Sequence, residues 1–191
     1  GYTHDSELGT LPAHHKDFYN NIKFKSPLTM RNTMDGIHNG EFASKVTAID
    51  FNKKSSQEEL IKMNDAIQHR GPDAADYFFK KEENKHIGLG HRRLSIIDLH
   101  ESANQPMVFN NLTIVFNGEV YNYKEIKQEL LAKGRVFKTQ SDTEVILQSF
   151  DEWKEDCVHK FIGMFSFLIY DKEKEEVTVF RDRPGVKPFH Y

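Results

Sequence analysis

The chain has 191 residues, 38% of them hydrophobic, so its length suits one globular domain with a core and is short for two. Its 26 basic and 29 acidic residues are interspersed and leave a formal net charge of −3, so no long-range field favours nucleic acid or an anionic membrane. One cysteine, no Cys/His cluster with zinc spacing, no membrane-spanning run and no signal-peptide core together favour a cytoplasmic protein without a metal site.

The first forty or so residues differ in texture from the rest. Gly1 to about Gly40 carry scattered His, Asn, Thr and Gly, few aliphatic residues and no sustained period, and the chain starts without a methionine. We interpret residues 1–42 as a leader, tag or linker segment. The apolar run from Val46 to Phe51 predicts a strand, so we expect the folded domain to span residues 43–191.

Three segments combine a cap residue, an acid three residues later and an apolar stripe, which together are the start signal of a helix. The three pairs of cap and acid are Ser56 with Glu59, Asn122 with Glu125, and Ser141 with Glu144. Gly71 and Gly134 are expected to end the first two of these helices.

Runs typical of β-strands lie between the helices, at residues 86–99, 112–116, 164–170 and 177–181. A charged turn separates the last two runs, which predicts a hairpin. Because strands and helices are mixed without regular βαβ alternation, the pattern favours an α+β sandwich of sheets and helices over a doubly wound sheet.

Five segments, in this order, resemble the glutaminase domain of asparagine synthetases, a class II glutamine amidotransferase. They are HRGPD at 69–73, LGHRRLSIIDL at 89–99, VFNGEVYNYKE at 115–125, TQSDTEVI at 139–146 and RDRPGVKP at 181–188. One segment alone would be a weak signal, but five in one order make chance agreement implausible. The resemblance covers roughly Val46 to Tyr191 and implies an Ntn-hydrolase fold, which is a four-layer αββα sandwich.

The resemblance also implies an activity and a partner. In this family the domain hydrolyses glutamine to glutamate and ammonia, and the ammonia passes to an ATP-dependent synthetase domain that activates aspartate. ATP and magnesium are expected only in that second domain, in the full-length protein or in trans, so no cofactor is expected within residues 43–191. Neither nucleic acid nor a membrane is an expected partner.

The resemblance assigns roles to residues of the matched segments. Arg93 would grip the α-carboxylate of glutamine bidentately, because a planar guanidinium can do so. Asn117 and Gly118 match an oxyanion hole built from a side-chain amide and a backbone N–H. Glu119 and Asp142 match residues at the polar ends of glutamine, with Asp142 the candidate for the α-ammonium. The backbone beside the arginine would complete the binding wall, at Leu94, Ser95, Ile96 and Ile97.

Each of these residues also has an ordinary structural explanation. Arg93 could form a surface salt bridge, the Asn117–Gly118 pair could make a hairpin turn, and Asp142 could serve the helix dipole. Arg70, in the HRGPD segment, is expected to serve the turn rather than catalysis. Cys157 is expected to be a buried, inert thiol.

The family's nucleophile is the main departure. Members begin with a cysteine whose thiolate attacks the glutamine amide, with the chain's own α-amine as base. An ungapped alignment of residues 49–52 places Ala43 at that position. Since loss of a nucleophile typically costs roughly 10⁴ to 10⁶ in turnover, we expect no useful glutaminase activity from this sequence.

Three explanations of the missing cysteine stay open, and with them the question of whether the chain is an enzyme. In the first, an active domain carries an altered N-terminus; in the second, the chain is a natural pseudo-glutaminase that binds glutamine or supports a neighbouring domain. In the third, a shift of one residue and cleavage before Ser44 would create an N-terminal serine nucleophile, although Lys45 then replaces a glycine close to the site.

Overall fold

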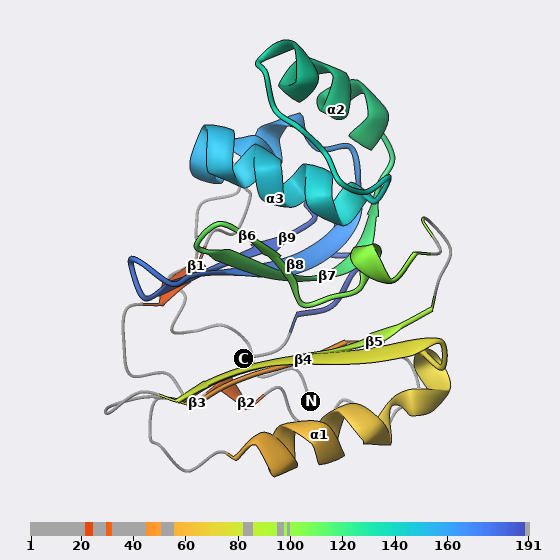
Figure 1. The fold of residues 1–191 in the computed structure, drawn as a ribbon, viewed down its shortest axis with the longest axis vertical. Helices are drawn as coiled ribbons and strands as arrows, with labels where there is room; N and C mark the ends of the chain where they lie inside the picture. Colours follow the sequence, from red (N-terminus) through yellow and green to blue (C-terminus); the bar gives the residue numbers. More distant parts are fainter. Residues whose placement is uncertain are drawn as a thin grey trace.

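The computed structural model describes residues 22–24, 30–31, 45–50, 56–81, 86–94, 98 and 100–189. Within these residues, two antiparallel sheets stack face to face and helices cover their outer surfaces (Figure 1). One sheet has the strand order β1-β9-β8-β7-β6, and the other has the order β2-β3-β5-β4.

The first sheet comprises β1 (Ile22–Phe24), β9 (Glu176–Arg181), β8 (Gly163–Asp171), β7 (Leu112–Val120) and β6 (Met107–Phe109). The second comprises β2 (Met30–Arg31), β3 (Lys45–Asp50), β5 (His86–Arg93) and β4 (Ala74–Lys81). The α-helices are α1 (Gln57–Ala66), α2 (Tyr123–Ala132) and α3 (Asp142–Trp153). Short 3₁₀ helices are η2 (Gln68–Arg70), η3 (Glu101–Ala103) and η4 (Lys154–Lys160).

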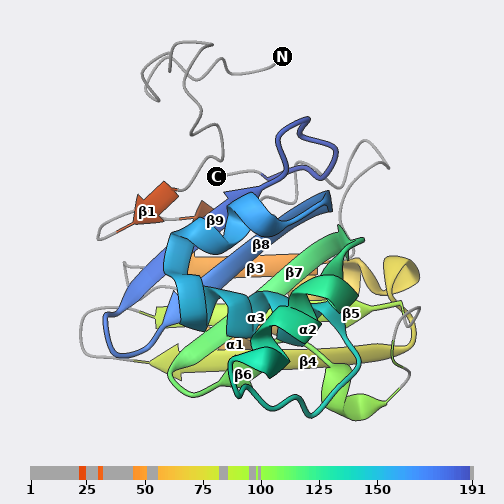
Figure 2. The ribbon, with the colours of Figure 1, turned by 90° about the horizontal axis from the view of Figure 1, so that it is seen from above.

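The layers confirm the expected α+β, four-layer αββα sandwich. Helices α2 and α3 lie over the sheet that contains β7 and β8, and α1 lies under the sheet that contains β4 and β5 (Figures 1 and 2). The order from top to bottom is therefore helix, sheet, sheet, helix. Within the described part of the chain, no helix is long and apolar enough to cross a membrane.

Alternation along the central strands divides the core into two parts. On β7, Ile114 and Phe116 pack in the cluster beneath α2 and α3, whereas Val115 packs in the cluster between the sheets. On β8, Phe167 and Leu168 divide in the same way. Because both faces of these strands are covered there, residues 114–116 and 167–170 are apolar at every position.

The helix start signals are right about position and only partly right about mechanism. Ser56 and Glu59 form the reciprocal capping box that was predicted. Ser141 caps α3, but Glu144 accepts hydrogen bonds from the backbone ahead of the cap instead of from the cap residue. The capping prediction for Asn122 is wrong, because its amide bonds the backbone at the end of η4.

The predicted strands are confirmed with changed ends. The run 86–99 forms β5 only as far as Arg93, and the run 112–116 continues in β7 to Val120. The hairpin of β8 and β9 is confirmed. Strands β1 and β2 fall inside residues 1–42 and pair with β9 and β3, so the backbone of that segment adds a strand to each sheet. Its assignment as a leader stays a prediction.

The loop after β5 is fastened to the segment that precedes α3. The carboxylate of Asp98 accepts hydrogen bonds from the backbone N–H of Gln140 at 2.7 Å and of His100 at 3.1 Å. The bond from Gln140, ahead of the other contributions, holds the pKa of Asp98 below its ordinary value of 3.8. One half-buried carboxylate therefore links two segments that are far apart in the chain.

Asp98→Asn tests this link through pH. A lowered pKa stabilises the folded chain fully above the ordinary carboxyl pKa, and this stabilisation is lost as the pH falls through the lower, folded value. Asparagine tolerates the positive φ of position 98 but carries no charge. We expect the melting temperature of the wild type to exceed that of Asp98→Asn at neutral pH and the difference to close in acid. A difference that stays constant down to acid unfolding would contradict the link.

The ladder between β7 and β8 leaves no room for a side chain at Gly118, which lies opposite Phe165. Its φ of 142° is one that L-residues rarely adopt, and a Cβ there would lie 2.0 Å from the carbonyl oxygen of Met164. Position 118 therefore requires glycine for two independent reasons.

Gly118→Ala is expected to destabilise the chain by ~3 kcal/mol or more, because backbone strain and overpacking add. Gly134→Ala is the matched control, since Gly134 also has a positive φ, of 85°, but has nothing within 4 Å of the added Cβ. The control should cost only about 1–2 kcal/mol in urea unfolding. Equal losses in the two variants would show that the close contact is relaxed at no cost.

Candidate functional site

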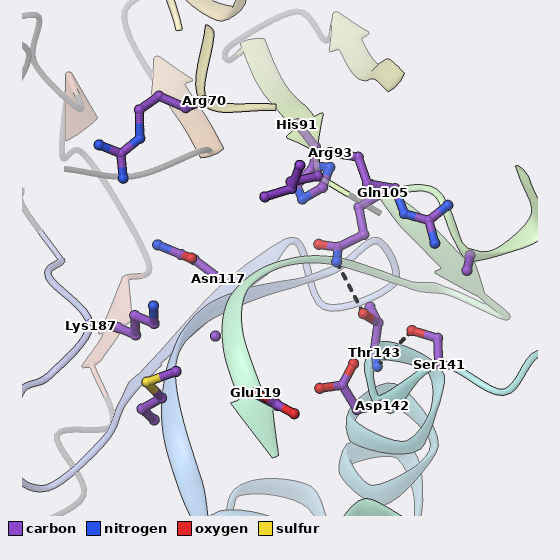
Figure 3. Close-up of a pocket in the computed structure, with 14 residues that line it drawn as sticks. Arg70, His91, Arg93, Gln105, Asn117, Glu119, Ser141, Asp142, Thr143 and Lys187 are labelled. Carbon is purple, nitrogen blue, oxygen red and sulfur yellow. Dashed lines mark hydrogen bonds between the residues drawn. The ribbon is translucent and has the colours of Figure 1, made fainter. Parts of the chain in front are cut away.

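A cavity of about 280 Å³ lies where the end of β5 meets β7 and the N-terminus of α3 (Figure 3). This volume is near the lower end of the roughly 300–1,000 Å³ of small-molecule sites, which suits a ligand the size of one amino acid. The charged residues of its lining are Arg70, Arg93, Glu119, Asp142 and Lys187. Cations and acids together fit a zwitterion better than a simple anion or cation.

The structure brings most of the predicted site residues to this one cavity. Its lining includes Arg93 at the end of β5 and Leu94 after it, residues 117–119 on β7, and Asp142 on α3. The other predicted residues lie outside the described residues: Ala43, Ser44, Ser95, Ile96 and Ile97. Three segments that are distant in the sequence therefore meet here, although their roles toward a ligand stay predictions.

Asn117 and Gly118 lie inside a strand, so the alternative of a hairpin turn is wrong. They pair with Ser166 and Phe165 of β8. The side-chain amide of Asn117 is half-buried and makes no hydrogen bond to any residue that the structure describes, so it can serve a bound molecule. Glu119, also half-buried in the lining, has likewise no side-chain partner among the described residues.

The backbone of Gly118 faces the open edge of β7. Along an antiparallel strand, successive N–H groups alternate between the two edges. The N–H of Phe116 points to the edge away from β8 and donates to Oε1 of Gln105 at 2.6 Å, and that of Val120 donates to Oδ2 of Asp142 at 3.2 Å. The N–H of Gly118, midway between them, therefore points to the same edge, where the strand borders the cavity.

Asp142 is the first residue of α3 and is only 5% exposed. Its carboxylate points toward β7, where it accepts the Val120 N–H, and it lies in the first turn of the helix, where the dipole favours an anion (Figure 3). The structural role that the helix position predicts is therefore present. It is compatible with an ammonium group in the cavity, because a carboxylate oxygen can accept more than one hydrogen bond.

Arg93 is 8% exposed, so it is not the surface residue of a simple salt bridge. Its guanidinium donates to the carbonyl oxygens of Asp98 and His100 and to Oδ1 of Asn104. It is directed toward this loop and away from Asn117 (Figure 3). Arg93 thus holds the loop beside the cavity, a role that the sequence did not indicate, and its grip on a carboxylate stays a prediction.

Lys187 is a lining residue that sequence reasoning missed. The Asp182 carboxylate accepts the backbone N–H of Lys187 at 3.0 Å and that of Val186 at 2.7 Å, and Arg181 donates to the Lys187 carbonyl at 2.8 Å. These bonds fix the backbone of the residue. Its ammonium has no hydrogen-bond or ion-pair partner among the described residues. The resemblance in RDRPGVKP marked this segment without giving the lysine a role.

Other missed lining residues are Arg70, His91, Gln105, Ser141 and Thr143. The interpretation of Arg70 as a turn residue left out its place in the cavity, where it lies on the same side as Asn117 and Lys187 (Figure 3). The HRGPD match was a signal that could have found it. Gln105 carried no local signal, because its neighbours form no recognisable pattern.

Cys157 is fully buried in the core beneath α2 and α3, as predicted, and burial raises the pKa of its thiol. Such a thiol is a poor nucleophile. In the portion of the chain for which side chains are described, no group of three or more His, Cys, Asp or Glu residues could hold a metal ion.

Comparisons with known proteins agree with this geometry. Residues 43–191 match a protein family described as "Glutamine amidotransferase domain". The chain is 49% identical to asparagine synthetase [glutamine-hydrolyzing] 1 of Bacillus subtilis over 140 residues, which cover 72% of this chain and 21% of that protein. It is 40% identical to asparagine synthetase [glutamine-hydrolyzing] 3 of the same organism, over 75% of this chain and 24% of that one.

Among solved structures, the glutamine phosphoribosylpyrophosphate amidotransferase of B. subtilis gives a TM-score of 0.46 at 19% identity, over 60% of this chain and 36% of that one. That likeness is too weak to bear on function. The chain spans less than a third of the length of the asparagine synthetases that it matches. The family match covers most of the chain, and the chain therefore belongs to the family of glutamine amidotransferase domains and is similar to the glutamine-hydrolysing asparagine synthetases.

Proposed function

We propose that residues 43–191 bind free glutamine in this cavity, as the glutaminase domain of an asparagine-synthetase-like protein. The observation that supports this most is the convergence of Arg93, the Asn117–Gly118 pair and Asp142 on one cavity. Three chemically different groups, which are a cation, a pair of amide donors and an acid, match the three polar parts of glutamine.

The charges favour one orientation of the ligand. The α-ammonium would lie against the buried carboxylate of Asp142, with Glu119 nearby on β7 as a second acceptor. The α-carboxylate would lie at Arg93, the predicted fork, whereas Arg70 and Lys187 belong to the same lining but lie on the side of Asn117 (Figure 3). A charge-assisted hydrogen bond in a site with little water is stronger than a neutral one, so each charge contact contributes to selectivity for a zwitterion.

The open edge of β7 supports the role proposed for Asn117 and Gly118. When a nucleophile attacks the side-chain amide of glutamine, the carbonyl oxygen becomes negative in the tetrahedral intermediate. The Gly118 N–H and the Asn117 amide would donate hydrogen bonds to this oxygen, and donors fixed in place by a strand need little reorganisation. The flanking N–H groups of β7 already have acceptors, so the strand directs one backbone donor at the ligand.

The nucleophile is the part of the proposal that this sequence does not supply. With Ala43 at the position of the family's cysteine, the chain binds glutamine without hydrolysing it. Where a cysteine stands at that position, the ammonia would pass to an ATP-dependent synthetase domain and on to aspartate, as the family resemblance implies; the relatives' names give asparagine synthesis and glutamine hydrolysis. A natural pseudo-glutaminase and a self-processed enzyme with Ser44 at its N-terminus are the two alternatives.

Glutamine is expected to raise the melting temperature of the full chain, because a ligand that binds only the folded state stabilises it by about 2.7 kcal/mol at 100 times its Kd. Asp142→Asn should weaken glutamine binding by about tenfold or more, through loss of the charge that faces the α-ammonium. Asparagine keeps an acceptor for the Val120 N–H, so the fold is spared. Glu125→Gln, in the first turn of α2, is the control for loss of a helix-dipole acid and should leave the shift intact.

Titration by calorimetry gives the same comparison without reference to stability. A chain that shows no response to millimolar glutamine in either measurement would leave only a structural or interaction role. A response that Asp142→Asn leaves at full strength would reject the assigned orientation of the ligand.

Ammonia release from glutamine tests the nucleophile. The unaltered chain should release none above background, and Ala43→Cys with a protease site before residue 43 should gain about 10⁴-fold or more once cleaved. The same variant left uncleaved is the control for the free α-amine. The strands β1 and β2 pair with the two sheets, so the cleaved segment can stay in place. Activity in the unaltered chain, lost in Ser44→Ala and accompanied by an intact mass that begins at Ser44, would favour self-processing.

A further inference from the structure

Gln105 lies two residues before the start of the short strand β6. The ladder between β6 and β7 pairs Val108 with Thr113 and Met107 with Ile114, so its continuation would set Gln105 opposite Phe116. The strand β6 begins only at Met107, so this continuation of the ladder is not formed. In place of a backbone carbonyl of β6, the side chain of Gln105 bonds this part of β7: its Oε1 accepts the Phe116 N–H at 2.6 Å.

The other end of the same side chain reaches helix α3. Nε2 of Gln105 donates to Oγ1 of Thr143 at 3.0 Å (Figure 3). Thr143 directly follows Asp142, and its own N–H is held by the cap residue Ser141 at 3.1 Å. Gln105 is 5% exposed and Thr143 2%, so water does not compete well for these bonds.

We propose that Gln105 is a positioning residue of the glutamine site, an inference that rests on the proposed function. One buried amide joins the residue before Asn117 on β7 to the residue after Asp142 on α3. It therefore sets the distance between the donors that face the ligand's amide and the acid that faces its ammonium. Gln105 acts through these neighbours and is not itself a catalytic residue.

The geometry makes this bridge hard to replace. The second described link between the two elements near the cavity is the bond from the Val120 N–H to Asp142, and it is longer, at 3.2 Å. If Gln105 were apolar, the buried Phe116 N–H would lose its acceptor and the end of β7 could shift relative to α3. Binding a small zwitterion at both ends is sensitive to such shifts, because displacements of about 1 Å already impair a site.

Gln105→Met in the full chain tests the bridge, since methionine has a similar length but neither donates nor accepts strongly. The matched control is Gln148→Met. Gln148, on α3, likewise carries a buried amide, whose Nε2 donates to the Val136 carbonyl at 2.8 Å and to Glu144 at 3.1 Å. Unlike Gln105, it does not line the cavity. Both variants should have a lower melting temperature than the wild type. Only Gln105→Met should weaken glutamine binding, by about tenfold or more in the Kd measured by calorimetry.

Thr143 provides a second measurement should Gln105→Met fail to fold. Thr143→Val removes the hydroxyl at nearly constant shape and should weaken binding, and Thr143→Ser, which keeps the hydroxyl, should weaken it less. The double variant Gln105→Met/Thr143→Val should weaken binding by less than the sum of the two single losses in free energy, because both changes break the same bond between Nε2 and Oγ1.

The outcomes separate this inference from the proposed function. Wild-type affinity in Gln105→Met, or equal weakening by Gln105→Met and Gln148→Met, overturns the positioning role and leaves glutamine binding standing. A wild-type chain with no affinity for glutamine overturns both.

Discussion

The shortness of β6, which begins only at Met107, is the constraint on which the site depends. Because that strand covers only the first part of β7, the edge of β7 beyond Ile114 is not satisfied by a neighbouring strand. Buried peptide groups need partners. The Phe116 N–H takes a glutamine side chain, the Val120 N–H takes a carboxylate from α3, and the N–H of Gly118 lies between them at the cavity. The incomplete pairing of β6 with β7 thus leaves backbone N–H groups of β7 to bond side chains and to face the cavity.

Two side chains serve both the scaffold and the lining of the cavity. Asp142 starts α3, accepts a bond from β7 and lines the cavity, while Arg93 ends β5 and holds the loop at 98–104. Substituting either one changes the scaffold together with the site. At Asp142 the isosteric change to Asn separates the two effects, because it keeps an acceptor for the Val120 N–H while it removes the charge.

Local sequence patterns predicted the structural features that depend on residues close together in the chain. The capping box at Ser56 and the apolar runs of β7 and β8 depend on neighbours in sequence, and both are confirmed. Asn122 looked like a cap, but its side chain is taken by a backbone segment forty residues on, which no local pattern can show. Arg93, Asn117 and Asp142 were found through the resemblance of their segments, because periodicity assigns no chemistry. Gln105 and Lys187 were missed, because only the register of distant strands and a folded loop bring them to the cavity.

Burial of Cys157 has a practical consequence for the study of this chain. The sequence contains one thiol, and it is sealed beneath α2 and α3 with its ionisation suppressed. Alkylating reagents at neutral pH should therefore not react with Cys157 in the native chain and should modify it only after the helical layer opens. The extent of labelling then measures how often this layer opens. A cysteine introduced at any surface position would then be the single reactive handle for a fluorophore or spin probe.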